Sequence, residues 1–167
     1  IFLGDAAEDQ HTACSGLRHG STAIREWHRT QRRVDVFDAK ADAEVALTAL
    51  GVRTGSLHVR AGGADYLHPG RSGQLVQGRT VLASFGEIHP KVLDDFGLRG
   101  VAVAFEIHLD DVPLPKAKGP ARSLLTMSVF QPVKRDFAFI VDAKTMASDL
   151  LKAVRSGAGP MLSNVDV

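Results

Sequence analysis

The sequence contains one cysteine, Cys14, among its 167 residues. A single thiol can form neither an intramolecular disulfide nor a thiolate cage around a metal ion. This excludes a disulfide-stapled secreted scaffold and a cysteine-based zinc finger. Because free thiols persist in a reducing compartment, the expected location is the cytoplasm.

Long apolar runs are also missing. The longest, residues 101–105 and 137–141, have five residues each, whereas a helix that crosses a bilayer needs roughly 18 to 20. The first ten residues hold three acidic side chains and no basic one, so they do not resemble a secretory signal. We expect no membrane span and no membrane partner. A chain that starts at Ile1 and stops within an alternating pattern is also expected to be a piece of a longer protein.

A strong charge of one sign is absent, since 20 basic and 19 acidic residues leave a net charge of +1. That balance does not by itself indicate nucleic-acid binding. The distribution is uneven, however: residues 1–111 carry a net charge of −3 and residues 112–167 a net charge of +4. The two parts are therefore expected to meet different partners.

The composition changes once, near residues 111–120, which contain three prolines, one glycine and two lysines. Proline lacks a backbone donor and fixes φ, so this stretch disfavours both a helix and a central strand. We interpret 112–120 as a linker between two domains.

Before the linker the pattern predicts a largely antiparallel sheet with helices, an α+β fold. Residues 101–109 alternate between apolar positions and a second face that includes Glu106 and His108, which is expected to be solvated or an interface. Residues 72–76 and 79–85 form a predicted hairpin around Gly78. A helix is expected from Asp38, acting as N-cap, to Gly51, and a second over 90–96.

After the linker, the pattern predicts a strand at 136–141, a helix that starts after a Thr145 cap and stops at Gly157, and another strand at 161–167. This strand, helix, strand unit is about half of a small α/β domain.

Two polar groups invite a chemical interpretation. His68, Glu87 and His89 form a recognised type of zinc ligand set. Their spacing does not support a metal site, however, and the favoured roles are a helix cap for His89, which precedes Pro90, and a turn position for His68. The stretch 68–72 has the chemistry of an anion cradle, with Arg71 able to bind phosphate, but it is also suited to a turn. Neither pattern has the spacing of an established motif.

A third group interleaves one aromatic side chain with arginines: Arg25, Trp27, Arg29, Arg32 and Arg33. Such a surface is able to stack on RNA bases. Nearby acidic residues favour instead a surface segment or a contact between subunits. The sequence contains no recognisable catalytic triad or Cys/His pair. It also lacks a glycine-rich phosphate-binding loop.

Five short motifs occur in a fixed order: 34–40 (VDVFDAK), 67–72 (LHPGRS), 84–90 (SFGEIHP), 105–107 (FEI) and 132–139 (PVKRDFAF). Together they cover nearly the whole chain, which resembles the β subunit of bacterial phenylalanyl-tRNA synthetase. Ala41 stands where the family pattern has Gly, and Gly73 where it usually has Ala.

The resemblance implies a C-terminal fragment of an aminoacyl-tRNA ligase subunit that is not itself catalytic. Residues 1–111 are then the C-terminal part of a class II synthetase-like module that supports the catalytic α subunit in an α2β2 assembly. Residues 121–167 are the first half of a ferredoxin-like anticodon-binding domain that contributes to binding tRNA(Phe). ATP and Mg²⁺ belong to the whole enzyme, and no cofactor is expected in this fragment.

For the site residues, the resemblance implies no catalytic residue and no metal ligand. RNA contacts are expected from five basic residues of the tail: Lys134, Arg135, Lys144, Lys152 and Arg155. Lys152 and Arg155 are equally suited to stabilising the C-terminal end of their helix. A structural role is expected for eight motif residues: His68, Pro69, Gly70, Arg71, Gly86, Glu87, His89 and Pro90.

Two rival functions remain open at this point. One is a small metal-dependent hydrolase that uses His68, Glu87 and His89. The other is a free-standing paralogue that binds RNA or protein outside a synthetase.

Overall fold

The computed structural model describes residues 1–24, 26–28, 30–114, 124 and 127–167. The chain divides into two compact units, Ile1–Lys116 and Ala117–Val167, which are described separately. Of the expected linker, residues 115–120 lie outside the described residues.

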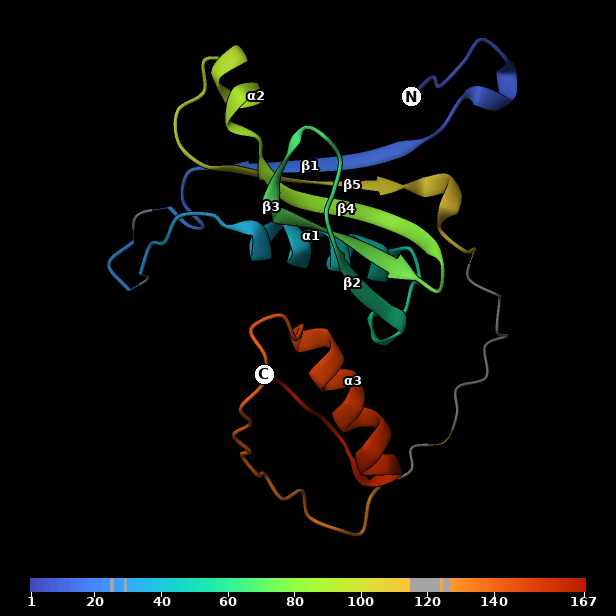
Figure 1. Cartoon of the computed structure of the whole chain (residues 1–167), viewed down its shortest axis with the longest axis vertical. Coiled ribbons are helices and arrows are strands. Elements are labelled where there is room, and N and C mark those ends of the chain that lie inside the picture. Colours follow the sequence, from blue (N-terminus) through green and yellow to red (C-terminus); the bar gives the residue numbers. More distant parts are fainter. Residues whose placement is uncertain (25, 29, 115–123, 125–126) are drawn as a thin grey trace. The chain divides into compact units, whose positions relative to one another are not determined.

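The first unit is built on one five-stranded sheet (Figure 1), in the order β1-β5-β4-β3-β2. Its strands are β1 (Ala13–His19), β2 (Leu57–Ala61), β3 (Leu67–Gln77), β4 (Thr80–Ile88) and β5 (Ala102–His108). Every neighbouring pair is antiparallel. The prediction of an α+β fold with a largely antiparallel sheet is therefore confirmed.

The hairpin of β3 and β4 forms where the sequence predicted it, with Gln77 opposite Thr80 and Gly78 at a φ of 63°. Strand β3 begins earlier than expected, at Leu67, so the turn predicted for His68 and its neighbours is wrong. Its pairing with β4 is irregular between Leu67 and Ser72. This irregularity explains the error, because a strand that breaks its ladder loses the alternating pattern used to detect it.

Strand β5 is an interior strand, paired with β1 on one side and β4 on the other. The expectation that the Glu106 face is solvated is wrong for its first half, since Ala102 and Ala104 are buried there. Glu106 and His108 are half-buried. Alanine is often buried, and a sequence pattern alone does not show whether the second face of a strand is covered.

The N-cap of helix α1 (Val36–Ala49) lies three residues before the expected position. Asp35, not Asp38, is the N-cap, and its side chain accepts hydrogen bonds from the backbone N–H groups of Phe37 and Asp38. Asp38 occupies the third helical position and accepts from the Asp35 backbone N–H, which completes a capping box. Gly51 follows the helix at a φ of 91°, as predicted for its end.

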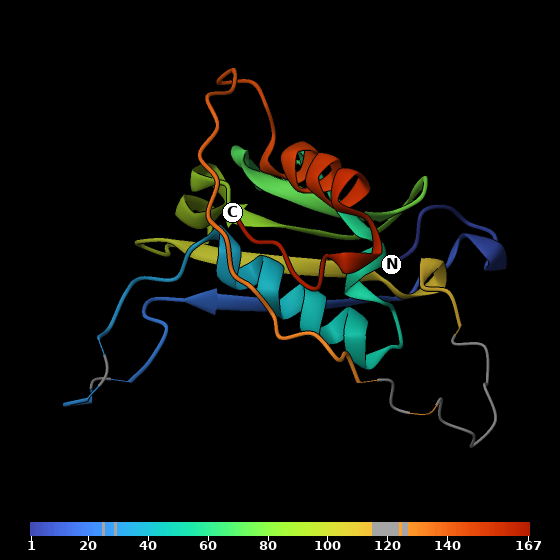
Figure 2. The ribbon, with the colours of Figure 1, turned by 90° about the horizontal axis from the view of Figure 1, so that it is seen from below.

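Helix α1 lies along one face of the sheet and closes the core (Figure 2). Its buried residues, Ala39, Ala43 and Leu47, recur at intervals of four, and the two alanines allow the helix to approach the strands closely. The facing residues come from three strands: Leu75, Leu82, Ala83, Phe85, Val103 and Ile107. Short 3-10 helices occur at Ala7–Asp9, Thr54–Ser56 and Leu109–Asp111.

Helix α2 (Pro90–Asp95) follows β4 directly (Figure 1). The Nδ1 atom of His89 accepts a hydrogen bond from the Lys91 backbone N–H at 3.2 Å. His89 therefore caps this helix, which was one of the two roles considered for it beside that of a zinc ligand. Gly97 follows at a φ of 67°.

In the second unit, one helix forms, α3 (Ala147–Ala158), followed by a 3-10 turn at Gly159–Met161. Its N-cap is Met146 rather than Thr145, and it continues through Gly157 to end before Gly159, whose φ is 64°. Both boundary predictions are therefore wrong. Gly157 is tolerated because glycine weakens a helix interior without breaking it.

The two strands predicted in the tail, 136–141 and 161–167, are not formed: Met161 ends the 3-10 turn, and residues 136–141 and 162–167 have no regular secondary structure. Phe137 and Ile140 are exposed. A strand gains its hydrogen bonds from a neighbouring strand, so an apolar pattern without a partner does not produce a sheet.

Among the described residues, no helix combines the length and apolar character required to cross a membrane.

Candidate functional site

The motif residues from two parts of the sequence meet at one end of the β3–β4 hairpin. We call this region the motif corner and define it as residues 67–72 of β3 together with 86–90, which end β4 and start α2. Leu67 pairs with Ile88, Ser72 pairs with Gly86, and the His89 backbone N–H donates to the Tyr66 carbonyl at 2.8 Å. The fold therefore joins two motifs that lie about 16 residues apart in the chain.

Polar side chains of the motif corner bind one another. The Arg71 guanidinium donates to Glu87 Oε2 at 2.7 Å, and the Glu87 side chain is only 14% exposed. The His68 and His89 rings are stacked with centroids 6.4 Å apart. The Gly70 backbone N–H donates to His68 Nδ1 at 3.1 Å.

This arrangement does not form the zinc site that the sequence left open. Glu87 is engaged by Arg71, while the Nδ1 atoms of His68 and His89 accept backbone hydrogen bonds. Among the described residues, no group of three or more His, Cys, Asp or Glu side chains is placed to hold a metal ion. The geometry thus gives no support to a metal-dependent hydrolase.

Gly86 allows the two strands of the corner to approach closely. A Cβ atom at this position would lie 2.6 Å from the Cβ of Ser72 and 2.9 Å from the Arg71 carbonyl oxygen. The Ser72 hydroxyl is buried and has no hydrogen-bond partner among the described residues. The corner is consequently packed too tightly to admit a side chain at Gly86.

The face of the sheet opposite α1 contains an isolated polar pair. The Tyr66 hydroxyl donates to Glu106 Oε2 at 3.2 Å. Burial, reinforced by the charge of Glu106 and by this hydrogen bond, raises the pKa of Tyr66 to about 12. Tyr66 therefore remains a neutral donor throughout the physiological range.

Arginines beside α1 are tied to its acidic residues. Arg32 donates to Asp38 at 2.6 and 2.8 Å and to Asp35 at 3.1 Å, and Arg18 donates to Asp42. The hydrogen bond from Arg32 holds the pKa of Asp38 below its ordinary value. Arg32 thus fastens the start of α1 rather than presenting a free charge.

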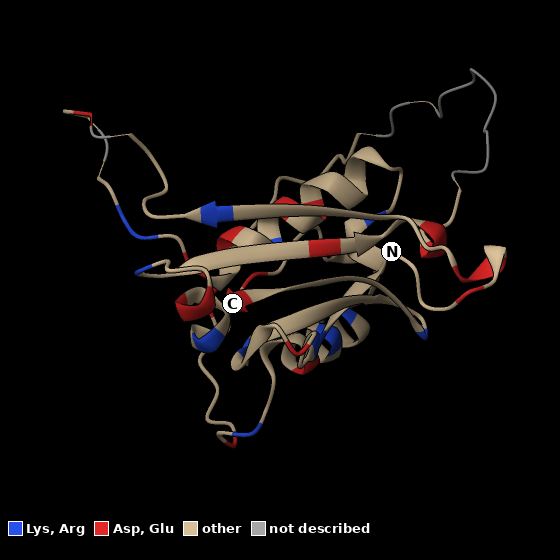
Figure 3. Ribbon diagram, turned by 90° about the horizontal axis from the view of Figure 1, so that it is seen from above, with Lys and Arg blue, Asp and Glu red and all other residues tan. Residues whose placement is uncertain are grey.

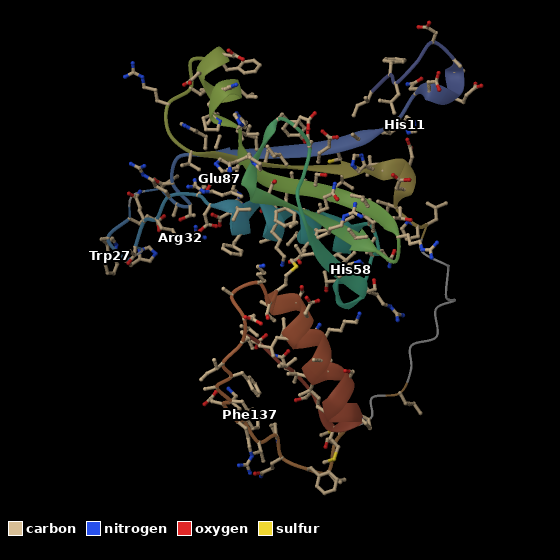
Figure 4. All side chains as sticks on the ribbon, viewed as in Figure 1. His11, Trp27, Arg32, His58, Glu87 and Phe137 are labelled. Carbon is tan, nitrogen blue, oxygen red and sulfur yellow. The ribbon has the colours of Figure 1, made fainter. Side chains whose placement is uncertain are left out.

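Residues 20–34 form an arm that leaves the end of β1 and returns to α1, with residues 25 and 29 outside the described part. Its two sides are joined by Thr22 N–H to the Arg32 carbonyl and Val34 N–H to the Gly20 carbonyl, each at 3.0 Å. Trp27 lies at the far tip and is 97% exposed, whereas Arg32 lies near the sheet (Figure 4). Of the expected aromatic and arginine group, Arg25 and Arg29 are not described, and Trp27 and Arg32 lie apart on the arm (Figure 4).

Two adjoining hollows lie near the motif corner and the base of the arm. The larger, about 470 Å³, is lined by His68, Arg71, Glu87, Ile88, Pro90, Leu93, Asp94, Leu98, Arg99, Gly100 and Val101. The smaller, about 220 Å³, is lined by His19, Gly20, Ser21, Arg33, Arg99, Gly100 and Val101. They share three residues and so are neighbours on the surface.

The tail residues expected to contact RNA are all exposed. Lys134 and Arg135 lie in a stretch without regular secondary structure, Lys144 lies in a turn, and Lys152 and Arg155 lie on α3. None of these five forms an ion pair with another described residue.

Sequence reasoning missed the Tyr66–Glu106 pair and the position of Arg99. Tyr66 and Glu106 are 40 residues apart, so only the order of the strands brings them together. Arg99 lies between Gly97 and Gly100, just before a predicted strand. An arginine flanked by glycines in a loop was the one sequence signal that could have indicated a binding residue there.

Comparison with known proteins agrees with the motif pattern. The family model described as "Phenylalanyl tRNA synthetase beta chain CLM domain" matches residues 1–109. The phenylalanine–tRNA ligase β subunit of Rhodospirillum rubrum is 45% identical over 165 residues, which are 98% of this chain and 21% of that subunit. The corresponding subunits of Brucella abortus and Cereibacter sphaeroides are each 41% identical, over 100% of this chain and 22% and 21% of their own lengths.

The chain thus spans about a fifth of the length of these curated relatives. The matched region includes the whole sheet, α1, the motif corner and the arm. Because this match covers well over half of the sequence, the chain belongs to the phenylalanyl-tRNA synthetase β-chain family.

Proposed function

We propose that this chain is a non-catalytic part of the β subunit of phenylalanine–tRNA ligase. In that role it supports the catalytic α subunit, within an α2β2 assembly in the cytoplasm, and contributes to binding tRNA(Phe) during ATP-dependent charging. The observation that carries the proposal is the family match over residues 1–109, which coincides with the sheet and the motif corner.

The chemistry of the motif corner supports a structural role for its residues. Catalysis requires groups that are free to bind a substrate or to move a proton. Here Glu87 binds Arg71, and His68 and His89 accept backbone hydrogen bonds. We therefore assign these motif residues to holding β3, β4 and α2 together rather than to catalysis.

ATP and Mg²⁺ are assigned to the whole enzyme and not to this part of it. Magnesium is held by carboxylate and phosphate oxygens. Among the described residues no group of three or more His, Cys, Asp or Glu side chains is placed to hold a metal ion, and this supports the assignment.

The two units are assigned different roles. Residues 1–111 correspond to the C-terminal part of a class II synthetase-like module. Residues 121–167 correspond to the first half of a ferredoxin-like anticodon-binding domain, whose remaining half would supply neighbours for residues 136–141. The net charge of +4 over 112–167 and the five exposed tail cations support a contact with RNA there.

The test is a chimera. The matching region of the Rhodospirillum rubrum β subunit is replaced by this chain and produced with the Rhodospirillum rubrum α subunit, beside the unmodified enzyme. Assembly and aminoacylation of tRNA(Phe) are expected from the chimera, and no phenylalanine-dependent pyrophosphate exchange from the chain alone. Exchange by the purified chain, or a folded chimera that fails to bind the α subunit, would contradict the proposal.

A further inference from the structure

The smaller hollow is lined by two arginines of the first unit. It opens where β1 ends, β5 begins and the arm leaves the sheet. Arg33 and Arg99 both line it, and among the described residues no aspartate or glutamate does. Figure 3 shows basic positions on the returning side of the arm.

The two arginines differ from Arg18, Arg32 and Arg71 of the first unit, because their charged groups are free. Arg18, Arg32 and Arg71 each donate to a carboxylate. In contrast, neither the Arg33 nor the Arg99 guanidinium makes a hydrogen bond or an ion pair with any described residue. Two uncompensated guanidinium groups, both belonging to residues that line one hollow, create a positive potential that attracts anions.

The backbone fixes where these two side chains begin. Ser21 and Arg33 are directly opposite one another in an antiparallel bridge. The Arg99 carbonyl oxygen lies 2.9 Å from His19 Nε2. Because a carbonyl can only accept, Nε2 carries the proton and donates, which ties the loop before β5 to the end of β1.

The size and the donors of the hollow indicate a phosphate group. Its volume of about 220 Å³ is below the roughly 300–1,000 Å³ of pockets for drug-sized molecules, so it suits a group more than a whole molecule. A carboxylate carries one charge and two oxygens, which one guanidinium fork satisfies. A phosphate offers more oxygens, and two forks and a hydroxyl can bind it together.

We propose that Arg33, Arg99 and Ser21 form a phosphate-binding site in the first unit. The phosphate belongs either to an RNA backbone or to a small molecule such as pyrophosphate, and both present the same oxygens. The larger hollow is not included, because Glu87 and Asp94 line it beside Arg71. This site is separate from the tail cations of the proposed function.

The experiment uses the intact, isotopically labelled chain. Amide resonances are followed by NMR during titration with sodium pyrophosphate, with sodium chloride of equal ionic strength as reference, and transfer RNA binding is measured separately. The variants are Arg33→Gln and Arg99→Gln. The controls are Arg53→Gln and Arg79→Gln, which remove the same charge from exposed positions outside both hollows.

Pyrophosphate is expected to shift the amides of Ser21 and Gly100, and each test variant to weaken its binding roughly fivefold, because charge-assisted hydrogen bonds to phosphate are lost. The controls are expected to leave binding nearly unchanged. A parallel loss of RNA affinity would identify the RNA backbone as the source, and a loss confined to pyrophosphate would identify a small phosphate. Absence of shifts at the hollow in the unmodified chain, or equal weakening by test and control variants, would overturn the proposal.

Discussion

Gly86 of β4 lies directly opposite Ser72 of β3, and the space between them is too small for a methyl group. The contact that a new Cβ would make at 2.9 Å involves the Arg71 backbone, which cannot rotate away as a side chain can. We expect Gly86→Ala to lower the free energy of unfolding by about 2 to 3 kcal/mol, as overpacked sites do.

Urea unfolding followed by far-ultraviolet circular dichroism measures this change. Gly70→Ala is the matched control, because a Cβ there would meet His68 at an ordinary 3.6 Å. Equal stability of the Gly86→Ala variant and the unmodified chain would show that the corner relaxes without cost.

The capping box of α1 gives a second prediction. Asp35→Ala removes the acceptor for the Phe37 and Asp38 backbone N–H groups, and it is expected to cost about 1 kcal/mol of unfolding free energy. Asp65→Ala, at an exposed acidic position, is expected to change stability by less than about 0.5 kcal/mol. Thermal unfolding of both variants distinguishes a cap from a general charge effect.

Tyr66 is the only tyrosine of the chain, so the absorbance of tyrosinate reports its ionisation alone. We expect a pKa of about 12 in the folded chain, compared with about 10 when unfolded. Because the folded state then holds the proton more tightly, stability is complete below about pH 10 and declines as the pH rises toward 12.

Glu106→Gln tests the cause of this shift. Removing the carboxylate charge is expected to lower the pKa of Tyr66, while burial, the largest cause, keeps it above about 10. An unchanged pKa in this variant would mean that the pair does not interact in solution.

Hydrogen exchange is expected to separate the two units. Amides of β5 are bonded to strands on both sides, whereas residues 137–141 have no ladder at all. Slow exchange is therefore expected in β5 and nearly unprotected exchange at 137–141. Comparable protection in both segments would indicate that the tail finds a pairing partner, and a dilution series would show whether that partner is another copy.

The tail cations give the last prediction. A triple variant, Lys134→Gln, Arg135→Gln and Lys144→Gln, is expected to weaken transfer RNA binding and to lower its dependence on salt concentration by about one unit of slope for each lost phosphate contact. Arg53→Gln, Arg79→Gln and Lys91→Gln together remove the same charge from the first unit. If both triple variants weaken binding equally, RNA is attracted by overall charge and not by the tail.

Local sequence patterns were sufficient for the elements that carry their own signal. The alternation of residues on two faces, with Val103 and Ile107 on the same one, predicted β5. The spacing of the apolar residues Ala39, Ala43 and Leu47 predicted α1. Strand β1 was missed because it contains Ser15, Gly16 and no β-branched residue; its strand conformation follows from pairing with β5 along its full length.

The site required information that the sequence pattern does not contain. The ion pair of Arg71 and Glu87 depends on the register of β3 against β4, and the shared position of Arg33 and Arg99 depends on the pairing of β1 with β5. The opposite error occurred in the tail, where the apolar pattern of residues 136–141 predicted a strand that has no neighbour to bind.

The single tryptophan of the chain is also its most exposed aromatic side chain, Trp27 at the tip of the arm. Its fluorescence is consequently quenched by water in the folded state almost as fully as in the unfolded state. Intrinsic emission would then miss the collapse of the sheet altogether, yet it would respond to any molecule that covers the arm. The residue usually chosen to report folding serves in this protein as a reporter of contact.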